Sequence, residues 1–106
     1  MIRHIVLIKF KPEVSESCIT EIYSGLWSLT NKLPGARHFT GGRSASPEQI
    51  ERGYFHAFVI DFDTWLDLKK YTDHPEHQAL GSQIVKNAIN GLDGLLVLDL
   101  EVPATD

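Results

Sequence analysis

Residues 2–11 of the chain read IRHIVLIKFK, and the predicted architecture starts from this stretch. Apolar and β-branched residues dominate it, which is typical of a β-strand. Successive side chains of a strand point to opposite faces, and here both faces are apolar in the middle, with Val6 and Ile8 on one face and Ile5 and Leu7 on the other. The pattern therefore predicts a central strand that is covered on both sides.

A second stretch, residues 54–62 with the sequence YFHAFVIDF, has the same character. Phe58 and Ile60 share one face, and Ala57 and Val59 share the other. We expect these two strands to be the middle strands of one sheet.

The segments between the strands carry the apolar period of amphipathic helices. In the first segment the apolar residues are spaced three or four apart: Ile19, Ile22, Leu26, Leu29 and Leu33. Ser15 is expected to cap this helix, and Pro34-Gly35 to end it. The second helical region is expected to begin with Asp63 as its cap, to restart at His74-Pro75 and to end near Asn90-Gly91.

Two shorter strands are predicted at residues 36–42 and 95–102, so that the order is β-α-β-β-α-β. This order is that of the ferredoxin-like split βαβ protomer, an α+β fold with a four-stranded antiparallel sheet and helices on one face. Residues 1–106 are predicted to form a single domain. Because the other face of the sheet is also apolar, we expect a second copy of the chain to cover it in a homodimer, a dimeric α/β barrel.

Composition narrows the class of protein further. The chain has 106 residues, a formal net charge of -4 and no basic cluster, which argues against nucleic acid as a partner. The single cysteine, Cys18, has no partner for an internal disulfide, as is usual in a reducing compartment. No signal-peptide core and no membrane span is recognisable, so a cytoplasmic protein without membrane contact is expected.

The candidate functional stretch is residues 71–77, YTDHPEH, which joins the two helical parts. It places a phenol, Tyr71, close to the imidazole of His77. His4 and His56 lie on the face of the central strands that the helices are expected to cover. Since neighbouring strands are about 4.8 Å apart, we expect these two imidazoles to approach each other beneath His77 and Tyr71.

Three segments together resemble the stress-responsive dimeric α/β-barrel domain family. They are the opening IRHIVLIKFKPEVSE, the middle PEQIERGYFHAFVIDF and the later YTDHPEHQAL, and they span nearly the whole chain. The resemblance implies a ferredoxin-like protomer that dimerises through its sheet into a barrel. Members of the family differ in function: some are plant proteins named for stress induction or heat stability, and one is a plant cyclase that closes a linear polyketide by an intramolecular aldol condensation.

The likeness to the cyclase implies catalytic roles for Tyr71 and His77 and pocket positions for His4 and His56. The helix after His77 departs from it, because Leu80 and Ala88 replace the expected aromatic lining. We therefore expect this chain to share the polar residues of the cyclase site. We do not expect it to share the shape of the cyclase's substrate.

The chemistry of these residue types fits proton transfer next to a carbonyl group. A histidine with an ordinary pKa of about 6.5 exchanges a proton near neutral pH. His77 is therefore the candidate general base, and Tyr71 the candidate hydrogen-bond donor to the developing oxyanion. His4 and His56 are candidate ligand-binding residues, and no metal or organic cofactor is required.

Structural roles remain open for each of these residues. His77 is alternatively a capping residue, His4 and His56 are alternatively hydrogen-bonded core residues, and Tyr71 alternatively fills the core. A zinc site is disfavoured, because no cysteine or carboxylate pair completes a ligand set around His74 and His77. Two function classes follow: a binding protein for a small apolar carbonyl-containing molecule, and, as the alternative, a cofactor-independent polyketide cyclase-like enzyme or lyase.

Overall fold

A computed structural model describes residues 1–104 of the chain. The elements, in chain order, are β1 (Ile2–Ile8), α1 (Glu16–Lys32), β2 (Ala36–Arg43), β3 (His56–Phe62), α2 (Trp65–Asp73), α3 (Pro75–Asn87), the 3-10 helix η1 (Gly91–Gly94) and β4 (Leu95–Glu101). This order is the predicted one, with the second helical region broken into α2 and α3.

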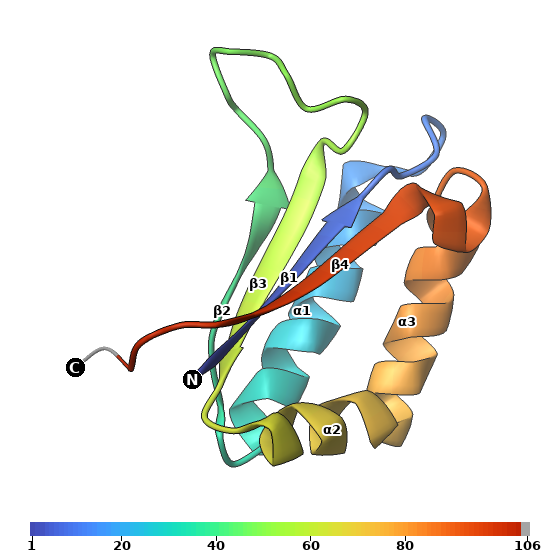
Figure 1. Ribbon diagram of the computed structural model, residues 1–106. Coiled ribbons are helices and arrows are strands. Elements are labelled where there is room, and N and C mark those ends of the chain that lie inside the picture. Colours follow the sequence, from blue (N-terminus) through green and yellow to red (C-terminus); the bar gives the residue numbers. More distant parts are fainter. Residues whose placement is uncertain (105–106) are drawn as a thin grey trace.

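The strands form one antiparallel sheet in the order β2-β3-β1-β4. β1 and β3 are the middle pair, as their two apolar faces predicted. The helices all lie on one side of the sheet, and the other side is left open (Figure 1). The fold is therefore the predicted ferredoxin-like arrangement.

The core lies between the covered face of the sheet and α1. On β1 every second residue is buried, beginning with Ile2, and the same alternation holds at the start of β3. The α1 side of the core consists of the predicted apolar stripe, of which Ile19, Ile22, Leu26 and Leu29 are buried. A leucine with no exposed surface, such as Leu29, contributes about 1.5–3 kcal/mol by its burial.

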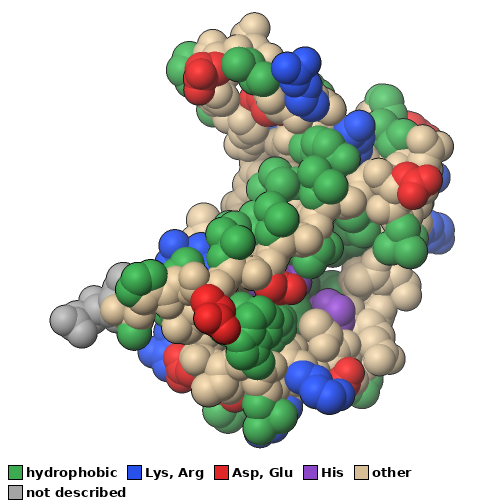
Figure 2. Space-filling view, in the orientation of Figure 1, with side chains coloured by type: hydrophobic (Ala, Val, Ile, Leu, Met, Phe, Trp, Pro, Cys, Tyr) green, Lys and Arg blue, Asp and Glu red, His purple; other side chains and the backbone are tan. Residues whose placement is uncertain are grey.

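The open face of the sheet is apolar as well. Leu96, Leu98 and Leu100 of β4 are 46%, 49% and 46% exposed, although they are large apolar side chains. They lie opposite Leu7, Ile5 and Arg3 of β1. Figure 2 shows hydrophobic side chains in a row along β4. We call the surface formed by Ile5, Leu7, Val59, Leu96, Leu98 and Leu100 the open face.

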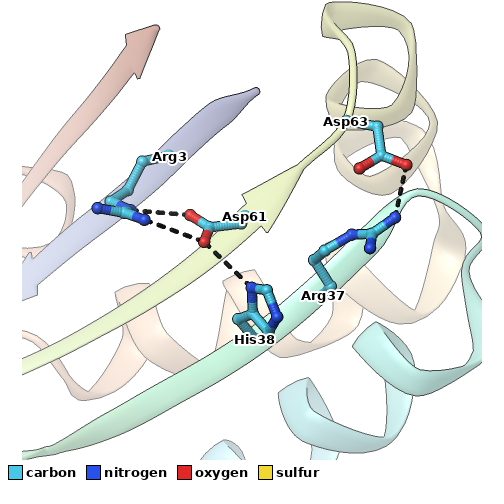
Figure 3. A network of polar contacts seen from close by, with 5 residues as sticks. All are labelled: Arg3, Arg37, His38, Asp61 and Asp63. Atoms are coloured by element: carbon cyan, nitrogen blue, oxygen red, sulfur yellow. Dashed lines mark hydrogen bonds and ion pairs between the residues drawn. The ribbon is translucent and has the colours of Figure 1, made fainter. Parts of the chain in front are cut away.

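One end of the open face is charged. Asp61 of β3 is 4% exposed and accepts hydrogen bonds from Arg3 Nε at 2.9 Å and Nη2 at 3.2 Å, with His38 Nδ1 at 3.4 Å (Figure 3). Hydrogen bonding from Arg3 lowers the pKa of Asp61, against the opposing effect of its burial. Asp61 is therefore an ionised, paired carboxylate, as a buried charge requires.

The helix starts follow the predicted capping chemistry with one correction. Ser15 caps α1 by accepting the Cys18 amide at 3.1 Å, as predicted. Thr64, and not Asp63, caps α2, because its hydroxyl accepts the Asp67 amide at 3.1 Å. Asp63 instead accepts a hydrogen bond from Arg37 at 2.7 Å (Figure 3).

His74 separates α2 from α3 and determines where His77 lies. Its backbone is extended, and its Nδ1 accepts the Glu76 amide at 3.1 Å, so that it caps α3. Pro75 then occupies the first helical position, which its fixed φ favours. None of the helices within residues 1–104 has the length and apolar character needed to cross a bilayer.

Candidate functional site

A cavity of about 730 Å³ lies between α3 and the sheet. It exists because α3 makes its main contacts with α1, α2 and η1 and stands away from the strands (Figure 1). Figure 2 shows the opening between β4 and α3. Most of the wall is apolar, and it includes Val6, Phe58, Ile84, Val85, Leu92, Leu95 and Val97.

His77 lines the cavity from the first turn of α3. Its Nδ1 lies 3.1 Å from the carbonyl oxygen of Thr72. A carbonyl only accepts hydrogen bonds, so Nδ1 carries the proton and the neutral ring keeps its lone pair on Nε2. Burial lowers the pKa of His77 below its ordinary value, and the nearby imidazoles of His4 and His74 act in the same direction, against the bond to Thr72. His77 is therefore neutral at pH 7, with Nε2 as an acceptor.

His4 lines the same cavity from β1, and its partner was not anticipated from the sequence. Its Nδ1 lies 2.6 Å from Oδ1 of Asp99, the residue directly opposite on β4. The carboxylate fixes the ring so that Nε2 is the free nitrogen. The sequence contained a usable signal, because Asp99 is the one charged residue in the run LLVLDL at 95–100.

Tyr71 lies next to both histidines but does not line the cavity. Its ring centroid is 4.4 Å from that of His77 and 5.8 Å from that of His4. The side chain is 0% exposed, and its hydroxyl has no hydrogen-bond partner within residues 1–104. Burial raises the pKa of this hydroxyl, which stays protonated. Tyr71 therefore offers an unused donor directly behind the cavity wall.

His56 does not join this group, and the expected approach of His4 and His56 is wrong. β1 and β3 are antiparallel, with His4 opposite Ile60 and His56 opposite Ile8. Four residues of strand therefore separate the two rings, which is roughly 13 Å.

His56 has partners of its own at the far end of the core. Its ring nitrogens lie 3.4 Å from the Tyr23 hydroxyl and 3.4 Å from a carboxylate oxygen of Glu16. Its ring also makes an edge contact with Phe10, at 5.3 Å between centroids. These contacts connect the start of β3 to the first half of α1 and to the segment after β1.

Within the described part of the chain, no group of three or more His, Cys, Asp or Glu side chains is placed to hold a metal ion. What the site does present is the Nε2 atoms of two cavity-lining imidazoles, of which that of His77 is an acceptor, with a phenol donor behind them.

Comparison with known proteins gives concordant results. Over 98 residues the chain is 30% identical to the stress-response A/B barrel domain-containing protein HS1 of Arabidopsis thaliana, covering 92% of this chain and 86% of that protein. Over 80 residues it is 26% identical to the olivetolic acid cyclase of Cannabis sativa, covering 76% of this chain and 79% of the cyclase.

Among solved structures, the chain is similar to a dimeric ferredoxin-like protein of unknown function from Jannaschia sp. CCS1. The TM-score is 0.89 at 35% sequence identity, over 95% of this chain and 98% of that one. The family model for the stress responsive A/B barrel domain matches residues 2–102. The chain belongs to the stress-responsive A/B barrel domain family.

Proposed function

We propose that the protein binds a small apolar molecule with a carbonyl group in the cavity between α3 and the sheet. The observation that carries this proposal is the combination of a mostly apolar cavity of about 730 Å³ with His4 and His77 in its wall. Apolar concave sites with a few polar groups at one place are the usual form of small-molecule sites.

The polar group of the ligand belongs at the two histidines. The Nδ1 atoms are held by Asp99 and by the Thr72 carbonyl, so each ring presents Nε2. His77 is neutral and accepts a hydrogen bond, which suits an enol, a hydroxyl or an acidic C–H next to the carbonyl. His56 is given a structural role here, because it lies at the other end of the core.

The test is a titration of the full-length protein with acetophenone, followed in the histidine ring region of the NMR spectrum. We expect shifts of the His4 and His77 ring signals, and weaker binding by His77→Ala. His38→Ala is the matched control, because the His38 imidazole is 64% exposed and lies outside the cavity. Unchanged ring signals with acetophenone and with methyl pentyl ketone would refute the proposal.

A second candidate, cofactor-independent proton abstraction of the kind a polyketide cyclase needs, is supported by two observations. His77 Nε2 is an acceptor held in one tautomer, and the buried Tyr71 hydroxyl is a donor that finds no partner in the described part of the chain. In this scheme Nε2 takes a proton from the carbon next to a carbonyl, and Tyr71 donates to the enolate oxygen. The enolate carbon then bonds to a second carbonyl carbon of the same molecule, and the new alkoxide recovers the proton from His77. Tyr71 reaches the ligand only if the His4 or His77 ring shifts on binding.

Deuterium exchange separates binding from catalysis. In heavy water, a base in the site exchanges the methyl protons of bound acetophenone, and proton NMR follows their loss. General-base catalysis contributes roughly 10²–10⁴ in rate, so His77→Ala is expected to reduce the exchange to the buffer rate. Binding without exchange above buffer would leave the first proposal and exclude the second for this ketone.

We also propose that two copies pair through the open face. Its exposed leucines support this, as does the dimeric state of the similar Jannaschia protein. A patch of this kind on a sheet is covered in a stable protein, since an uncovered one promotes aggregation.

A further inference from the structure

Gly81 is a glycine that the fold itself does not need. It lies in the middle of α3, where glycine destabilises a helix relative to alanine. Apart from its chain neighbours and the backbone of its own helix, no heavy atom of residues 1–104 lies within 4 Å of a Cβ atom built on Gly81, and the residue does not have the positive φ that would require glycine. No steric or backbone reason therefore accounts for it.

Gly25, the glycine of α1, shows the contrast. A Cβ on Gly25 would lie 2.7 Å from a methyl carbon of Leu80, so this glycine lets α3 pack closely on α1. Leu80 and Gly81 are adjacent, and one faces α1 while the other faces empty space. α3 thus packs on α1 through Leu80, whereas Gly81 leaves the neighbouring face of the helix without a side chain.

The empty space above Gly81 is the cavity. Gly81 lines it, four residues after His77 and four before Val85, so that all three share one face of α3. Along the helix axis, Gly81 is about 6 Å from His77. A ligand whose acidic C–H next to the carbonyl lies at His77 Nε2 therefore places the group on the far side of that carbonyl over Gly81.

We propose that Gly81 determines the specificity of the cavity by leaving room for a flat ring attached directly to the ligand's carbonyl carbon. The substrate class that this room adds is aryl ketones, beside the straight-chain ketones that need no space at position 81. A side chain at position 81 would occupy the position of the ring, whereas a flexible alkyl chain passes beside it. The inference rests on the proposed binding function and adds the shape of the ligand to it.

The test uses three probes, namely acetophenone, methyl naphthyl ketone and methyl pentyl ketone, with the full-length protein. We expect Gly81→Ala to weaken methyl naphthyl ketone about tenfold or more, since overfilling a packed site by one methyl group is felt. Gly81→Leu should abolish binding of both aryl ketones, and methyl pentyl ketone should bind Gly81→Ala as it binds the wild type. Gln83→Leu places a leucine at an exposed position of α3 outside the cavity lining and should change nothing.

The outcomes separate the two proposals. If the wild type binds none of the three ketones, the binding function fails, and the role of Gly81 fails with it. If the wild type binds and Gly81→Leu still binds aryl ketones equally well, or Gly81→Ala loses all ketones alike, only the role of Gly81 is overturned. The melting temperature is a second readout: Gly81→Ala should melt above the wild type, and a lower value would show that the space is not free.

Discussion

Among residues 1–104, the buried hydroxyl of Tyr71 has no hydrogen-bond partner, and mutation can measure the cost of this one unsatisfied atom. A buried, unsatisfied polar group costs about 1–3 kcal/mol. Tyr71→Phe removes the hydroxyl and keeps the ring that packs between His4 and His77. We therefore expect the free energy of unfolding to rise by about 1 kcal/mol in urea denaturation. A fall of that size would mean that the hydroxyl has a partner in the protein.

His77 gives the unliganded protein a specific pH dependence. Its pKa is lowered in the folded chain, chiefly by burial, so the unfolded chain takes up the proton first as the pH falls below about 6.5. Stability is thus full above pH about 6.5 and is lost as the pH falls toward the lowered pKa, by at most about 1.4 kcal/mol per pH unit. His77→Gln should remove this slope between pH 7 and 5, measured by urea denaturation at each pH. An unchanged slope would show that His77 takes up its proton equally in both states.

At the scale of elements, the start of α2 tests the corrected cap. Thr64 accepts the Asp67 amide, whereas Asp63 only pairs with Arg37 at the surface. Thr64→Ala should therefore reduce the free energy of unfolding by about 1 kcal/mol. Asp63→Ala is the matched control and should cost less than about 0.5 kcal/mol, because both partners of its ion pair are half exposed. If Asp63→Ala reduced the free energy of unfolding more than Thr64→Ala did, Asp63 would be the cap, as predicted from the sequence.

The two central strands show which features of a sheet a sequence pattern predicts: the order of the strands and the face of each side chain, but not the register. Two apolar faces identified β1 and β3 as the middle pair, because only a strand covered on both sides has that pattern. The alternation of side chains along each strand correctly placed His4 and His56 on the covered face. This alternation does not show how far apart the two histidines lie along the strands. β1 and β3 are joined by α1 and β2, so no tight turn sets their register.

The remaining errors at the site have the same origin. Asp99 was missed because its role depends on lying opposite His4 across a pair of strands from the two ends of the chain. The cavity was not predictable in size, since it depends on how far α3 stands from the sheet. His77 and Tyr71 were placed correctly relative to each other, because one short break between two helices connects them.

At the scale of the whole molecule, the sheet separates the cavity on one side from the exposed leucines on the other. The covered face forms the core and one wall of the cavity, so a ligand there contacts β1, β3 and β4 from one side only. The open face has no part in that cavity. The proposed dimerisation and the proposed ligand binding would therefore use opposite sides of the same strands, so that a change on one side would reach the other through the strands.

Leu98→Glu tests the pairing of two copies directly. Leu98 is 49% exposed near the middle of the open face, and a stable dimer buries about 800 Å² on each partner, so a carboxylate there would be desolvated without a partner. Light scattering should give about twice the 11.9 kDa of one chain for the wild type and one chain for Leu98→Glu. Leu66→Glu, at a 59% exposed position of α2, is the matched control and should remain a dimer. A wild type that scatters as one chain at every concentration would contradict the proposed pairing. A dimeric Leu98→Glu variant would show that the copies pair through another surface.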